Sequence, residues 1–288
     1  MNRARLLEAE ARWALPAAIC AFAAAALFIA ATVVIQSGPL TSDTTVQFLR
    51  EYDDARGTML VAAILNALAL FAFAPVLLYL FRAASVRSSG VRGGLVGIVV
   101  AGPLFLGAAE ILQHIAIAGA ASDFASPGGG AGIPIGEYAD DLIRDQGLFG
   151  VAQGLSFAGV LGFVIGLIYT ALWAMRVGLL TRFFGTFGMA LGASLILIAQ
   201  AFSLLALMLW AVWLGLIYLD RVPGNRPPAW DAGEAVPWPK PGEEPQDRDA
   251  EPDVVEGDAT ELIGTTNGEN PNAARRERAK RRKRKRRQ

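Results

Sequence analysis

Five long stretches of the chain contain no charged residue, and this feature limits its possible folds more than any other. They are residues 13–35, 57–81, 93–109, 146–175 and 183–219. Apolar runs of about 18 or more residues without charge are typical of membrane-spanning helices. A soluble domain carries about a quarter charged residues, whereas this chain carries 18%. The sequence therefore predicts an all-α integral membrane protein.

The lengths of these runs predict the number of helices. We expect single spanning helices over 14–36, 58–81, about 94–120 and about 147–175. Residues 183–219 would form one helix about 55 Å long, while the hydrocarbon core is only about 30 Å thick. Two short helices with a tight turn near Gln200–Ser203 fit better, which predicts a bundle of six transmembrane helices over residues 1–222.

The distribution of charge between the runs predicts the orientation. Basic segments precede the first run, follow the second and fourth runs, and follow the last; the other loops are acidic. Basic loops stay on the cytoplasmic side, and the alternation is strict if 183–219 crosses twice. We therefore expect a multi-pass protein of the cell membrane with both termini in the cytoplasm.

Small residues and prolines within the runs predict how the helices pack. Three pairs of glycines lie four residues apart: Gly150 with Gly154, Gly162 with Gly166, and Gly188 with Gly192. Such pairs let helix backbones approach closely in a membrane. We also expect Pro75 and Pro103 to bend their helices.

Polar residues inside the apolar runs are the candidate functional site. Glu110 and His114 are four residues apart on one helix face, with Gln113 beside them, and His114 is the only histidine. Counting along the antiparallel helices places other polar residues at a similar depth, in the outer half of the membrane. The candidate intramembrane polar site comprises Asn66, Glu110, Gln113, His114, Gln153 and Ser156.

This layer has two interpretations. Ionisable groups within a membrane often mark a proton relay or a substrate pathway. Polar side chains can also form interhelical hydrogen bonds that only fix the packing. With one carboxylate and no intramembrane Lys or Arg, we favour the packing network.

The chain lacks the motifs of an enzyme or a cofactor protein. It has no HExxH, no GxSxG, no CxxC and no phosphate-binding loop. The single cysteine, Cys20, excludes a disulfide within the chain and a Cys/His metal cluster. We expect no catalytic residue, no metal and no cofactor.

After residue 222 the composition changes, which predicts a disordered cytoplasmic tail over 223–288. A proline-rich part is followed by nine acidic residues between Glu243 and Glu261. Eleven basic residues close the chain: Arg275, Arg276, Arg278, Lys280, Arg281, Arg282, Lys283, Arg284, Lys285, Arg286 and Arg287. Anionic lipid headgroups attract such residues near a membrane. We rank lipid binding, or pairing with the acidic stretch, above nucleic acid.

Three passages resemble a known group of sequences. "LLYLFRAA" (77–84), "AMRVGLLTRFFGTFGMALGA" (174–193) and above all "RPPAWDAGEAVPWP" (226–239) are similar to uncharacterised actinobacterial multi-pass membrane proteins. The resemblance implies a membrane protein in which a Trp/Pro segment follows the last helix. It carries no functional residue over to this chain.

These observations leave two hypotheses of function. The one we favour at this point is a structural or accessory membrane protein whose tail contacts anionic lipid. The alternative is a small-solute or proton-coupled transporter with Glu110 and His114 in its pathway.

Overall fold

The computed structural model describes residues 3–37, 43–126, 133–197 and 200–239, and within these ranges the chain forms helices and no strand. Residues 1–241 form one compact unit, and residues 242–288 lie outside the described residues. The prediction of an all-α fold is confirmed for the part that the structure describes.

Four helices are long and apolar enough to cross a membrane: α1 (Arg3–Gln36), α3 (Arg56–Arg87), α4 (Val96–Ala125, preceded by the 3-10 turn η1, Gly93–Leu95) and α6 (Gly147–Arg176). The run 183–219 forms two helices, as predicted: α7 (Arg182–Leu197) and α8 (Gln200–Tyr218). The predicted turn at Gln200–Ser203 was wrong, because these residues form the first turn of α8. The two helices have 16 and 19 residues. At 1.5 Å per residue α7 is about 24 Å long, shorter than a hydrocarbon core of about 30 Å. The six-span topology requires α7 and α8 to cross the membrane as well, and this crossing remains a prediction.

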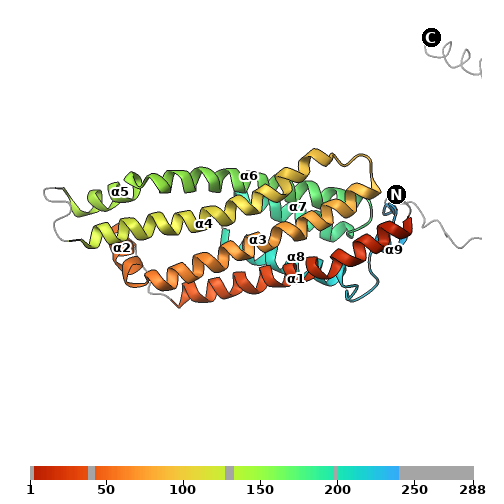
Figure 1. Cartoon of the computed structure of the whole chain (residues 1–288), viewed down its shortest axis with the longest axis horizontal. Coiled ribbons are helices and arrows are strands. Elements are labelled where there is room, and N and C mark those ends of the chain that lie inside the picture. Colours follow the sequence, from red (N-terminus) through yellow and green to blue (C-terminus); the bar gives the residue numbers. More distant parts are fainter. Residues whose placement is uncertain (1–2, 38–42, 127–132, 198–199, 240–288) are drawn as a thin grey trace, which may run out of the picture. The chain divides into compact units, whose positions relative to one another are not determined.

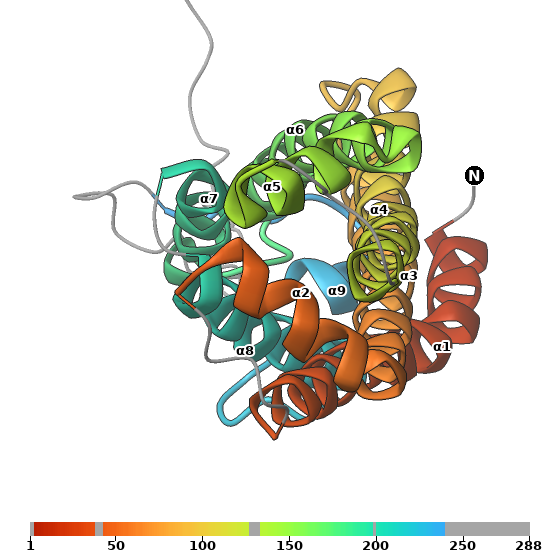
Figure 2. The same cartoon turned by 90° about the vertical axis from the view of Figure 1, so that its left-hand side faces the viewer.

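The six apolar helices form a closed ring, seen end-on in Figure 2. Going round it, α1 packs on α3, α3 on α4, α4 on α6, α6 on α7, α7 on α8, and α8 returns to α1. The ring places residues from six separate sequence segments around one interior.

Two short helices lie in what the sequence analysis treated as acidic loops. α2 (Thr45–Asp54) and α5 (Ile135–Asp145) cover the end of the ring opposite the α1 N-terminus (Figure 1). The Thr44 hydroxyl caps α2 by accepting a hydrogen bond from the Gln47 amide at 3.3 Å. Both helices bury an apolar face: Leu49 and Tyr52 of α2 and Ala139 of α5 join an apolar cluster with the end of α4.

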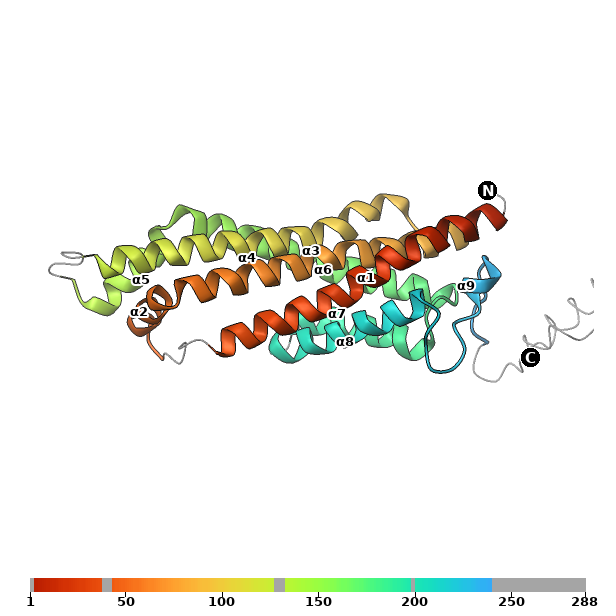
Figure 3. The ribbon, with the colours of Figure 1, turned by 60° about the horizontal axis from the view of Figure 1, so that its bottom comes forward.

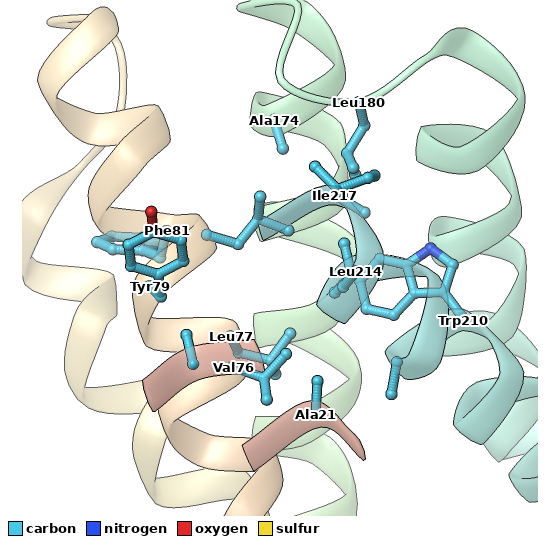
Figure 4. Packing of buried hydrophobic residues seen from close by; sticks show 14 of the residues in the cluster. Ala21, Val76, Leu77, Tyr79, Phe81, Ala174, Leu180, Trp210, Leu214 and Ile217 are labelled. Carbon is cyan, nitrogen blue, oxygen red and sulfur yellow. The ribbon is translucent and has the colours of Figure 1, made fainter. Parts of the chain in front are cut away.

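The main apolar core fills the other half of the ring, toward the α1 N-terminus. Figure 4 shows its centre, where Val76 and Leu77 of α3 face Trp210, Leu214 and Ile217 of α8. These side chains have close to zero exposure. The ring is thus filled with hydrocarbon side chains at one end, and the polar residues of α3, α4 and α6 lie toward the other.

Glycine determines the closest helix contact. A Cβ on Gly102 of α4 would lie 2.3 Å from the Phe163 amide nitrogen, and one on Gly162 of α6 would lie 3.2 Å from the Gly102 Cα. The predicted pairs 162/166 and 188/192 lie against neighbouring helices. The prediction for Gly150 and Gly154 was wrong, because a Cβ on either has nothing within 4 Å. Spacing alone does not distinguish a glycine at an interface from one on an open face.

The start of the predicted disordered tail is ordered. Residues 223–239, which we call the strap, contain the short helix α9 (Ala229–Ala232) and pack on the N-terminal end of the ring (Figure 3). Trp230 is 2% exposed, and its Nε1 donates to the Leu179 carbonyl at 2.9 Å. Trp238 Nε1 donates to the Leu180 carbonyl at 2.8 Å.

The predicted disorder from residue 223 therefore fails for 223–239. The proline-rich composition indicated that this segment has no core of its own. Trp230 nevertheless buries its ring in the core that the helices provide, and the half-buried Trp238 is hydrogen bonded beside it. Residues 240–288 lie outside the described residues.

Candidate functional site

A cavity of about 320 Å³ lies inside the ring. Every one of the six apolar helices contributes to its wall, from Phe28 of α1 to Leu195 of α7 and Met208 of α8. On the side of the main core it is bounded by Phe163, whose ring stacks edge-on against the buried Phe73 ring at a centroid distance of 5.4 Å. The cavity therefore begins where the apolar core ends.

Five of the six predicted site residues line this cavity. Asn66 comes from α3, Glu110 and Gln113 from α4, and Gln153 and Ser156 from α6. Glu110 and Gln113 are three residues apart, as are Gln153 and Ser156, so each pair lies on one face of its helix. The antiparallel arrangement of α3, α4 and α6 brings together residues that are far apart in the sequence.

The sixth predicted residue, His114, lines an adjoining cavity of about 300 Å³. Asn66, Glu110 and Gln113 line both cavities, so the two share one polar wall. His114 is 6% exposed. It therefore sits beside the central cavity and takes no part in its lining.

Tyr52 of α2 is a member of the site that the sequence analysis missed. Its hydroxyl and His114 Nδ1 form a buried hydrogen bond of 2.7 Å, and Tyr52 also lines the second cavity. Burial and the neighbouring Glu110 carboxylate raise the pKa of Tyr52 to about 12, so its hydroxyl stays protonated at neutral pH. Only the amphipathic pattern of residues 45–54, which we had assigned to a loop, could have indicated this contact.

The cavity side chains do not form the packing network that we favoured. Among the described residues, the side chains of Asn66, Glu110, Gln113, Gln153 and Ser156 make no hydrogen bond with one another or with a neighbouring helix; the one hydrogen bond of this region joins His114 and Tyr52. Glu110 is half-buried, while Gln153 is exposed. These side chains line cavity space and have no hydrogen-bond partner among the described residues.

The chemistry of the cavity follows from its donors and acceptors. Three amides, a hydroxyl and a carboxyl group line it, and neither cavity has a Lys or Arg in its wall. The described residues contain no group of three or more His, Cys, Asp or Glu that could hold a metal ion. Such a site suits a small uncharged or positively charged molecule that both donates and accepts hydrogen bonds.

A second polar cluster lies at the opposite end of the ring, under the strap. Arg87 of α3 has a fully buried side chain and forms a two-pronged ion pair with Glu10 of α1, in which Arg87 Nη2 lies 2.8 Å from Glu10 Oε2. Its Nε donates to the Ala229 carbonyl of the strap at 3.0 Å. Its guanidinium lies 5.6 Å from the Trp230 ring centroid. All of these donors and acceptors have protein partners, so the cluster holds α1, α3 and the strap together.

The predicted lipid-binding tail, Arg275–Arg287, lies outside the described residues. Comparison of the chain with protein-family models, with curated proteins and with solved structures finds no match. The resemblance to actinobacterial membrane proteins remains a prediction.

Proposed function

We propose that this protein is a membrane carrier or receptor that binds a small uncharged or cationic solute in the cavity between its helices, with Glu110 as the group that gains or loses a proton. It develops the alternative of our two hypotheses, a small-solute or proton-coupled transporter. The apolar helices support a membrane location, and the cavity supports a role for the helix bundle beyond that of a scaffold.

One observation carries the proposal: polar side chains from three helices line a common cavity without being hydrogen bonded to one another. A structural network would satisfy its own donors and acceptors, because unpaired polar groups in a membrane are costly. Here Asn66, Glu110 and Gln113 line a space of about 320 Å³. That volume falls within the range of about 300–1,000 Å³ for small-molecule sites.

The role of Glu110 follows from its surroundings. Among the described residues no basic side chain lines the cavity, so the charge of an ionised Glu110 would be balanced by a bound cation or removed by protonation. A cationic solute would bind the carboxylate, and protonation would release it. This competition is a simple way to couple solute binding to protons.

The basic tail supplies an additional, separate role. We retain the proposal that Arg275–Arg287 binds anionic headgroups, at about 1 kcal/mol for each basic residue near the surface. Binding of a peptide of residues 240–288 to vesicles should require anionic lipid and weaken with salt. Tight RNA binding without lipid binding would contradict this role.

Stability measurements distinguish the solute site from a packing network. Without solute, replacing Asn66 or Gln113 with leucine should leave the melting temperature unchanged or raise it, since neither side chain has a hydrogen bond to lose. In a packing network each change would lose an interhelical bond worth about 0.6 kcal/mol. Ser194→Ala, which removes a hydroxyl bonded to the Leu191 carbonyl within α7, is the control for a small polar change elsewhere.

Flux measurements test the proton step. The full-length protein in proteoliposomes should take up small amines or polar solutes in response to a pH gradient, and Glu110→Gln should abolish the pH dependence while folding normally. Glutamine keeps the shape of the side chain but cannot cycle a proton. If wild type and Glu110→Gln behave alike, and the leucine variants are destabilised, the bundle is a scaffold and the accessory role is correct.

A further inference from the structure

A groove separate from the central cavity runs between α1 and α3 and has a volume of about 460 Å³. Its wall is formed by one face of each helix, between Leu6 and Cys20 of α1 and between Pro75 and Val86 of α3. It lies in the half of the molecule that contains the N-terminus, beside the main core. We propose that this groove holds one anionic phospholipid, with an acyl chain between α1 and α3 and its phosphate at Arg82.

The two ends of the groove differ in chemistry. Cys20 and Pro75 form the end that lies deeper along the apolar helices, and the charged residues Glu10 and Arg82 both lie near the other end. Lining positions 6–20 extend over about 21 Å of α1, which is comparable to the roughly 15 Å that one leaflet contributes to the hydrocarbon core. A molecule with a long apolar part and a charged end matches this order.

The charge at the mouth is positive. The Glu10 carboxylate forms an ion pair with the buried guanidinium of Arg87, and only 14% of the Glu10 side chain is exposed. Arg82 is exposed, and its guanidinium has no hydrogen bond or ion pair among the described residues. Arg82 is therefore the unpaired cation at the charged end of the groove, which we call its mouth. A guanidinium binds phosphate oxygens in a two-pronged geometry.

Trp13 supports a position at the membrane boundary. Its side chain lines the groove and is 63% exposed. Tryptophan is enriched where the hydrocarbon meets the headgroups. The mouth of the groove then lies at headgroup depth, where a phospholipid carries its phosphate.

Photolabelling of the full-length protein in vesicles tests the proposal. The probes are phosphatidylglycerol and phosphatidylcholine, each with a photoactivatable group near the end of one acyl chain and present in trace amounts. Labelled peptides are mapped by mass spectrometry. We compare the groove residues Cys20 and Leu78 with Phe183, which is 67% exposed at the same end of the bundle and reports contact with bulk lipid.

We expect phosphatidylglycerol to label the groove more than the Phe183 surface, and about fivefold more than phosphatidylcholine does, from the attraction of one basic residue. Arg82→Gln should remove this preference. Arg12→Gln is the matched control: Arg12 is exposed on α1 next to Trp13 but does not line the groove, so the preference should persist.

Four results would overturn the proposal. Groove labelling equal to that at Phe183 would show bulk lipid only. Equal labelling by the two probes, or unchanged labelling in Arg82→Gln, would remove the anionic headgroup from the site. Absence of lipid label in the groove together with crosslinks between groove peptides of two copies would assign the groove to a protein contact. None of these results depends on what the central cavity binds.

Discussion

Trp230→Ala should detach the strap and destabilise the whole bundle. The side chain is 2% exposed, stacks on the Tyr79 ring at a centroid distance of 5.7 Å, and donates from Nε1 to the Leu179 carbonyl at 2.9 Å. Its ring also lies 4.7 Å from the Arg226 guanidinium. A disordered tail, which the composition predicted, would make the same substitution silent.

The magnitude follows from these contacts. Replacing a buried tryptophan with alanine costs about 3–5 kcal/mol, including the cavity it leaves. For a domain of this size each kcal/mol lowers the melting temperature by about 2–4 °C. We therefore expect a decrease of about 6–20 °C in the full-length protein, measured in detergent by far-ultraviolet circular dichroism. Trp238→Phe, which removes one hydrogen bond and keeps most of the ring, should lose only about 1 kcal/mol.

Limited proteolysis supplies the second measurement. In wild type the strap should resist cleavage, and in Trp230→Ala it should be cut at low protease concentration, because a docked segment must detach before it is cut. A melting temperature within 2 °C of wild type, with an equally resistant strap, would refute the packing argument.

Three further predictions concern packing and titration. Gly102→Ala should destabilise the bundle by at least about 2 kcal/mol, because the new Cβ would lie 2.3 Å from a backbone nitrogen of α6. Gly154→Ala is the control and should melt like wild type, because a Cβ at this position has nothing within 4 Å. Arg87→Met should cost about 3 kcal/mol in thermal unfolding, since it leaves its carboxylate partner without a counter-charge. The pKa of Tyr52, raised from 10.0 to about 12, predicts stability that is fully present below pH 10 and is lost as the pH rises through about 12. Tyr52→Phe should remove this alkaline loss and cost about 1 kcal/mol at neutral pH through the lost bond to His114, and an unchanged alkaline profile would contradict the assignment.

Apolar length and charge alone determined much of this protein. Five charge-free runs fixed where the apolar helices lie, because the hydrocarbon of a membrane requires every backbone group to be hydrogen bonded within a helix. The excessive length of 183–219 indicated the break between α7 and α8. Depth counting along antiparallel helices was enough to group Asn66, Glu110 and Gln153, since the rise per residue is constant.

Only the tertiary structure shows that those polar residues line a cavity. Sequence gives the depth of a side chain along its helix but not the rotation of that helix about its axis, so a packing network and a cavity wall look alike. Closure of the ring by α8 against α1 created the interior that Glu110 lines. The sequence analysis missed Tyr52 of α2, the hydrogen-bond partner of His114. A ten-residue amphipathic helix gives a much weaker signal in the sequence than a membrane-spanning helix does. The strap was missed for a related reason: Trp230 contacts Tyr79 of α3, Tyr218 of α8 and Leu179 of the turn after α6, and no local pattern of residues 223–239 contains that surface.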